Sequence, residues 1–217
     1  IIEKKEILMN KHVLSFAGYP IYVIESEFNL NDKELNFLRN LEYKEQPTKF
    51  LKISSDADIL KLEHLKRLKE FIKESLNDYV SNVLEINNKI SFCQSWSTIQ
   101  NEGSHHPYHF HENHLFSCVY YAKAEKTELT FSISKSKIQD NFFFDYDIKN
   151  NNIFNSRAYT VPLKTGDIIF FPGHLGHETS LNKERERIAV GASFFIEGKL
   201  GSHTTGIDIT NNKNIKY

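Results

Sequence analysis

Apolar and polar residues alternate with two different periods along the chain, and the period changes near residue 88. Over residues 59–83, apolar positions recur mostly every two to four residues, which is typical of an amphipathic helix. A shorter helix is predicted over residues 32–41, because Asn31 is a suitable N-cap and Glu34 follows three residues later. The N-terminal third is therefore expected to be mainly helical.

After this change the pattern follows the two-residue period of β-strands almost to the end of the chain. β-Branched and aromatic residues dominate six segments that are bounded by turn residues. These candidate strands are residues 90–99, 115–122, 129–133, 158–162, 167–171 and 187–196. Helices followed by a dense run of strands predict an α+β fold, with the N-terminal helices packed on one side of a β-sandwich or barrel. One or two short strands are also expected within residues 12–28.

One domain is expected for all 217 residues, because this length and a hydrophobic content of 40% are ordinary for a single packed core. Residues 1–88 would be mainly helical support, residues 89–197 the β-core and residues 198–217 a polar tail. Cys93 and Cys118 both lie in apolar, strand-like contexts, so we interpret them as reduced core residues.

The formal net charge is -1, which gives no long-range field to attract nucleic acid or an anionic membrane. No apolar run approaches the ~20 residues needed to span a bilayer. The first residues include acidic side chains and no small-residue cleavage site, unlike a secretory signal. We therefore expect a cytoplasmic protein whose partner is a small molecule, with neither nucleic acid nor a membrane involved.

Two segments have two interpretations each. Five basic residues along the predicted helix, within residues 61–73, could bind phosphate, but interleaved glutamates favour a solvated helix face. Residues 134–157 are long for a connection between strands. They could form a lid, or a hairpin extension that packs its own aromatic residues.

The segment around His109 and His111 is the first candidate for chemistry. In an extended segment, residues i and i+2 project from the same face, so these two imidazoles can converge on one metal ion. His105, His106 and His114 flank the pair closely enough to support the ligands or contact a substrate, but we favour a surface or loop position for each of them.

A second candidate region follows the strand predicted at residues 167–171. His177 lies shortly after that strand, and His174 is a rival three residues earlier. On the last strand a face made of one arginine and three small residues suggests a pocket for an anion, since guanidinium pairs with a carboxylate in a bidentate geometry. The residues of this face are Arg187, Ala189, Gly191 and Ser193. The alternative for Arg187 is a surface ion pair with Glu184 or Glu186.

Together these residues predict one site, in which His109, His111 and His177 hold a metal and Arg187 anchors an acidic co-substrate. Three histidines with an open position would also suit a zinc-bound water, so a zinc hydrolase is an alternative. A non-catalytic binding protein on the same scaffold is another.

The motifs that carry this site resemble the Fe(II)- and 2-oxoglutarate-dependent oxygenase superfamily, particularly a branch from bacteria and phages. The matching parts are a Ser-Trp strand, a glycine turn, H-x-H, a strand ending in V-Y-Y, a Gly-Asp turn, F-P, the distal histidine and the arginine strand. In this chain they are Ser95-Trp96, Gly103, His109-Phe110-His111, Ser117–Tyr121, Gly166-Asp167, Phe171-Pro172, His177 and Arg187. The resemblance covers roughly residues 90–196.

The resemblance implies a double-stranded β-helix, or cupin-like jelly roll, with Fe(II) at its open end. It implies a dioxygenase that consumes 2-oxoglutarate and O2, hydroxylates a small molecule or side chain, and releases succinate and CO2. Arg187 and Tyr121 would hold the distal carboxylate of 2-oxoglutarate, with Ser193 as a further co-substrate contact on the same strand as Arg187.

Two positions depart from the pattern. Most of the superfamily has Asp or Glu at the second ligand position, which gives two histidines and one carboxylate. Here that residue is His111, and the adjacent Glu112 is an alternative carboxylate ligand that should point away from His109. Cys118 replaces the usual glycine.

Overall fold

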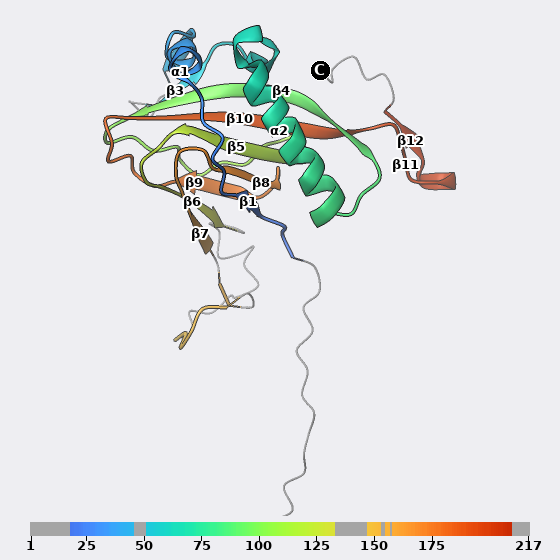
Figure 1. Cartoon of the computed structure of the whole chain (residues 1–217). Helices are drawn as coiled ribbons and strands as arrows, with labels where there is room; N and C mark the ends of the chain where they lie inside the picture. Colours follow the sequence, from blue (N-terminus) through green and yellow to red (C-terminus); the bar gives the residue numbers. More distant parts are fainter. Residues whose placement is uncertain (1–17, 46–50, 133–146, 153–154, 157, 210–217) are drawn as a thin grey trace, which may run out of the picture.

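Two antiparallel sheets form the body of the protein, which is described by a computed structural model for residues 18–45, 51–132, 147–152, 155–156 and 158–209 (Figure 1). The larger sheet has seven strands in the order β1-β8-β5-β10-β4-β3-β2. Their bounds are Tyr22–Ile24 (β1), Ile168–Pro172 (β8), Phe116–Lys123 (β5), Glu186–Glu197 (β10), Lys89–Asn101 (β4), Leu51–Ser54 (β3) and Tyr43–Glu45 (β2).

The smaller sheet has three strands in the order β7-β6-β9. Their bounds are Ala158–Leu163 (β7), Thr127–Ser132 (β6) and Gly176–Thr179 (β9). The two sheets pack face to face, so the core is the predicted double-stranded β-helix. A separate hairpin of β11 (Lys199–Leu200) and β12 (Ile207–Asp208) follows the core.

Alternating residues of the long strands build two hydrophobic layers, as the period of two requires. Tyr120 and Phe170 face outward and pack with the helices α1 (Asp32–Arg39) and α2 (Lys66–Asp78). The next residue on each strand, Tyr121 or Phe171, faces inward and packs between the two sheets. The helices thus cover one face of the large sheet (Figure 1). Its other face is turned to the small sheet, so residues on that face can line a site between the sheets.

The predicted long helix is interrupted. Residues 59–83 form two short 3-10 turns, then α2, then a π turn at Tyr79–Val83. Leu62 is extended, and the chain before it is held by strand β4: the Leu60 N–H donates to Ser95 Oγ at 2.9 Å and the Ser95 N–H to the Ala57 carbonyl at 2.8 Å. Hydrogen bonds to the sheet therefore override the local helical preference.

The other element predictions are largely confirmed. Helix α1 begins at the predicted cap, where Asn31 and Glu34 form a capping box. All six candidate strands are present, with ends shifted by up to two residues. The prediction missed β2 and β3 in the N-terminal third, β9 in the core, and β11 and β12 in the expected tail.

Ion pairs occupy most of the basic residues near α2, which fits a solvated helix face rather than a phosphate site. The pairs are Lys61–Asp58, Lys66–Glu63, Arg67–Glu34 and Lys73–Glu70. Exposed pairs of this kind contribute little to stability.

Both cysteines are free, as predicted. The candidate lid at residues 134–157 lies mostly outside the described residues. Among the helices that are described, none is long and apolar enough to cross a membrane.

Candidate active site

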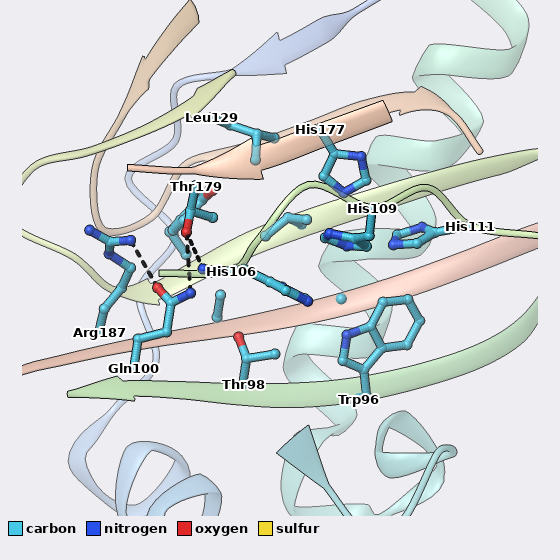
Figure 2. A pocket seen from close by; sticks show the side chains of 14 residues that line it. Trp96, Thr98, Gln100, His106, His109, His111, Leu129, His177, Thr179 and Arg187 are labelled. Carbon is cyan, nitrogen blue, oxygen red and sulfur yellow. Dashed lines mark hydrogen bonds between the residues drawn. The ribbon is translucent and has the colours of Figure 1, made fainter. Parts of the chain in front are cut away.

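Three histidine side chains converge at one end of the space between the sheets (Figure 2). His109, His111 and His177 each offer one ring nitrogen, and these atoms lie within 4.8 Å of one another. The backbones of His109 and His177 exchange two hydrogen bonds, of 3.0 and 2.8 Å, so the H-x-H segment runs beside β9. The His111 N–H donates to the Gly173 carbonyl at 2.8 Å. This pairing brings the predicted distal histidine to the predicted pair.

An outward hydrogen bond orients each of the three rings. Nδ1 of His109 lies 2.8 Å from the Pro107 carbonyl, and Nδ1 of His177 lies 2.9 Å from the Leu175 carbonyl. A carbonyl only accepts, so both Nδ1 atoms carry the proton and each Nε2 keeps its lone pair. Nδ1 of His111 lies 2.5 Å from the Ser117 hydroxyl, which can accept in the same way. All three Nε2 atoms can therefore serve as ligands at one point.

The histidine cluster is held in its neutral form. Burial, and then the neighbouring imidazoles, lower the pKa of His111 to about 2. Burial likewise lowers the pKa values of His106 and His177 to about 3, and it lowers the pKa of His109. Neutral imidazole is the form that binds a divalent metal.

The metal-free protein should lose stability as the pH falls below 6.5, the ordinary histidine pKa. Below that pH the unfolded chain binds protons that the folded cluster does not, so each such histidine removes about 1.4 kcal/mol of unfolding free energy per pH unit. Urea unfolding at several values between pH 8 and pH 5 would measure this slope. His106→Gln should make it shallower by one proton, and an unchanged slope would contradict the assignment.

The remaining histidines separate into two groups. His106 lies in a loop, which is one of the two positions expected for it, but its ring stacks on His109 with a centroid distance of 3.9 Å and lines the same cavity. His114 lies further out, with its ring centroid 6.5 Å from that of His111. His105 and His174 are exposed, so the rival to His177 is excluded. Only the stacking on His109, which is a tertiary contact, distinguishes His106.

Glu112 does not supply the missing carboxylate. Its side chain is exposed, and it is not part of the described group of possible metal ligands. Adjacent residues in an extended segment point to opposite sides, so Glu112, which follows His111 directly, projects away from the cluster. The candidate ligands are therefore three neutral side chains.

The floor of the cavity is a ladder of paired residues on β4 and β10. Cross-strand partners are Trp96 with Gly191, Thr98 with Ala189, and Gln100 with Arg187, and all six line the cavity. In the first of these pairs a large residue, Trp96, faces the smallest one, Gly191. The i, i+2, i+4 spacing of the β4 residues was the signal in the sequence that could have identified them.

Trp96 forms a wall of the cavity. Its indole lies flat against Gly191, where an added Cβ would come within 2.5 Å of the ring. It also meets His111 edge to face, with ring centroids 5.3 Å apart (Figure 2). Gly191 is needed because only a residue without a side chain leaves room for this indole.

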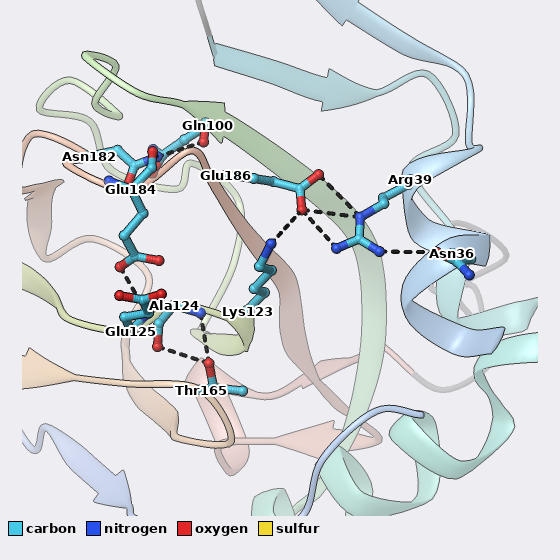
Figure 3. Close-up of polar contacts among 10 residues, drawn as sticks. All are labelled: Asn36, Arg39, Gln100, Lys123, Ala124, Glu125, Thr165, Asn182, Glu184 and Glu186. Carbon is cyan, nitrogen blue, oxygen red and sulfur yellow. Dashed lines mark hydrogen bonds and ion pairs between the residues drawn. The ribbon is translucent and has the colours of Figure 1, made fainter. Parts of the chain in front are cut away.

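Arg187 lies at the other end of the ladder and is 2% exposed. Its Nη1 donates to Gln100 Oε1 at 2.8 Å and to the Ser180 carbonyl at 3.1 Å. Burial lowers its pKa, but guanidinium stays charged in proteins. The alternative of a surface ion pair is wrong, because Glu186 instead pairs with Arg39 and Lys123 (Figure 3).

Two buried polar atoms beside the cavity have no hydrogen-bond partner among the described residues: Arg187 Nε and the Tyr121 hydroxyl. Burial raises the pKa of Tyr121, so its hydroxyl keeps its proton and can donate. Both residues line the cavity that holds the three histidines. Burying a cation and an unpaired donor costs folding free energy unless an anion accepts hydrogen bonds from both.

Ser193 does not line this cavity, so the prediction of a co-substrate contact there is not supported. It is fully buried, with Ser117 and Gln94 as its cross-strand partners. The next residue inward on the same face is Gly191, and the Trp96 indole covers it. The cavity therefore ends before it reaches Ser193.

Ser117→Ala should weaken metal binding about 10- to 100-fold, the usual cost of removing a group that orients a ligand. Without its hydroxyl, Nδ1 of His111 loses the partner that fixes its ring. Ser193→Ala is the matched control on the facing strand, since its hydroxyl has no partner among the described side chains. Metal affinities from chelator competition would test this, and equal losses in both variants would contradict it.

Comparison with known proteins gives a family match for the part of the chain that holds the site. Residues 94–194, which contain the whole ladder and all three histidines, match the family model described as “Putative 2OG-Fe(II) oxygenase”. The match supports assigning this region to the 2OG-Fe(II) oxygenase superfamily. This match and the three-histidine cluster support Fe(II), 2-oxoglutarate and O2 as the metal and co-substrates. No curated protein matches the chain in sequence.

Solved structures with low sequence identity share the fold. The non-heme α-ketoglutarate-dependent epimerase SnoN from nogalamycin biosynthesis is 13% identical over 88% of each chain, with a TM-score of 0.57. HygX from Streptomyces hygroscopicus, with nickel and 2-oxoglutarate bound, is 11% identical over 80% of this chain and 82% of its own (TM-score 0.51). A 2OG-Fe(II) oxygenase family oxidoreductase from Burkholderia pseudomallei is 10% identical over 73% and 74% (TM-score 0.51).

The side chains of this site are chemically suited to bind Fe(II) and 2-oxoglutarate. Three neutral imidazoles suit a divalent metal, and a buried guanidinium with an unpaired phenol suits a dicarboxylate. Its departure from the usual pattern is His111, which leaves the ligand set without a negative charge.

Proposed function

We propose that this oxygenase is a hydroxylase of a small molecule or a side chain. In the overall reaction one atom of O2 enters the substrate, and 2-oxoglutarate becomes succinate and CO2. His109, His111 and His177 would hold Fe(II) through their Nε2 atoms. Arg187 and Tyr121 would hold the distal carboxylate of 2-oxoglutarate.

The observation that carries this proposal is the unpaired Arg187 Nε and Tyr121 hydroxyl in the cavity of the three histidines. A metal site alone gives no reason to bury a cation beside it. An acidic co-substrate that reaches from the metal to the arginine does, because its carboxylate would complete both groups.

The other residues would position and shield the reactants. Val119, Leu129 and Ala189 line the cavity and exclude water from it. The carbonyl and hydroxyl acceptors behind the three histidines keep Nε2 directed at the metal. When bound, the iron supplies the activation of O2 that no side chain can provide.

For the substrate we propose only a chemical class. HygX has been solved with hygromycin B bound, and its chain is 13% identical to this one over 80% of the present sequence, with a TM-score of 0.52. A small molecule is the substrate class that this likeness and the near-neutral charge favour. Trp96 forms the wall beside His111, where a substrate would lie against the indole.

An anaerobic titration of the metal-free protein with Fe(II) and then 2-oxoglutarate tests the proposal. A visible charge-transfer band, followed by succinate on admission of O2, is the expected result. Tight zinc binding without any such band would favour a three-histidine hydrolase. Absence of both metal and 2-oxoglutarate binding would leave a non-catalytic binding protein. With a substrate in hand, 18O from O2 in the product separates hydroxylation from epimerisation.

A further inference from the structure

No carboxylate among the described residues forms an ion pair or hydrogen bond with Arg187, although the charge of Glu184 acts on it from a distance. Both groups that accept from its Nη1, the Gln100 amide and the Ser180 carbonyl, are neutral. The two nearby glutamates are engaged elsewhere. Glu184 accepts from the N–H groups of residues 125 and 126, and Glu186 lies between Arg39 and Lys123 (Figure 3). The guanidinium therefore has no direct anionic partner in the described protein and can still bind an external anion.

The hydrogen bonds of Arg187 also select which of its edges is open. Nη1 is occupied by two acceptors, whereas Nε has no partner in the described part of the chain. A carboxylate binds guanidinium with two parallel hydrogen bonds, and it needs a free edge to do so. The Nε and Nη2 edge is the one that remains, and the unpaired Tyr121 hydroxyl also lines this cavity.

Hydrogen bonds fix the side chain of Gln100 with its amide oxygen facing Arg187. Guanidinium has only donors, so the amide oxygen must face it and the amide nitrogen must point away. That nitrogen donates to Thr179 Oγ1 at 3.3 Å, and Thr179 Oγ1 also accepts from the His106 N–H at 2.8 Å (Figure 2). The Gln100 carbonyl is held by the Asn182 side chain at 2.7 Å. The amide is thus locked between the arginine and the segment that leads to the histidines.

We propose that Gln100 is a positioning and specificity residue: it holds Nη1 without neutralising Arg187 and so reserves the Nε edge for the distal carboxylate of the 2-oxo acid. This rests on the proposed function. A glutamate of the same shape could still accept from Nη1, but its charge would satisfy the arginine. A methionine would leave the charge of Arg187 unchanged, but it would remove the acceptor that holds Nη1 in place.

The test compares wild type, Gln100→Glu and Gln100→Met after loading with Ni(II), which keeps the complex unreactive. Calorimetry measures the affinity for 2-oxoglutarate and for pyruvate, a 2-oxo acid without a distal carboxylate. Gln94→Glu is the matched control, because Gln94 is exposed on the same strand and does not line the cavity.

Gln100→Glu should weaken 2-oxoglutarate binding roughly 30-fold or more, the lower end of what disrupting a buried charge pair costs. Gln100→Met should weaken it roughly 10-fold, in line with a hydrogen bond to a charged group. Pyruvate and Ni(II) affinities should stay at the wild-type level in all variants. With iron and O2, KM for 2-oxoglutarate should rise while kcat at saturation changes little.

The outcomes separate the two proposals. If wild type binds 2-oxoglutarate and Gln100→Glu binds it equally well, the role of Gln100 is overturned and the proposed function stands. If both variants lose pyruvate and 2-oxoglutarate alike, the role is structural and the inference is also overturned. If loaded wild type binds no 2-oxoglutarate, both proposals fall.

Discussion

His111→Ala is expected to reduce metal affinity roughly 100-fold or more and to abolish succinate formation. Only two imidazoles would remain, and no described carboxylate is close enough to replace the third. Equilibrium competition with a chelator under anaerobic conditions would measure the affinity for Fe(II), and for Ni(II) as an unreactive substitute. The metal-to-protein ratio of the purified variant should fall together with its metal affinity.

His174→Ala is the matched control, since His174 is exposed and lies three residues from His177. Its metal affinity should equal that of wild type. Unchanged affinity in His111→Ala would instead show that another group completes the site. His106 would be the first candidate, because its ring stacks on His109.

Much of the site could be predicted because it depends on local periodicity. The period of two put His109 and His111 on one face and Glu112 on the other, and it put Arg187 on the face with Ala189. These relationships hold for any extended segment, whatever the rest of the fold does. The structure agrees with them at each of these residues.

The parts that could not be predicted depend on contacts between distant segments. Strand β9 is four residues long, too short for a periodic pattern, and its pairing with the H-x-H segment is what places His177. The break at Leu62 follows from hydrogen bonds to Ser95 on β4. Neither Leu62 nor its neighbours carry a helix-breaking residue that would have indicated it.

The positions of Trp96 and Ser193 depend on which residue lies opposite across a strand pair, and a single sequence does not give that register. His106 lies outside the strands, and its stacking on His109 is a tertiary contact that the sequence does not give either. Trp96 faces Gly191, which opens space for the indole, and the same indole closes the cavity before Ser193. One glycine thus decides the position of both residues.

Arg187→Met should lower the affinity for 2-oxoglutarate at least about 100-fold, because the distal carboxylate would enter a buried pocket with no cation. Metal affinity should persist, since Arg187 is not part of the group of possible ligands. Stability should fall by roughly 1–3 kcal/mol for each buried acceptor that loses its donor, namely Gln100 Oε1 and the Ser180 carbonyl, so the affinities are measured where both proteins are folded. Arg185→Met, at an exposed arginine two residues earlier, is the control.

Arg187→Lys distinguishes charge from geometry in the same assay. Lysine keeps the positive charge but presents it as a point, so it cannot offer two parallel donors to a carboxylate. We expect an intermediate loss of roughly 10-fold, in line with one charged hydrogen bond. A lysine variant that binds as tightly as wild type would show that charge alone suffices. The open Nε edge, and the orientation that Gln100 gives it, would then have no part in affinity.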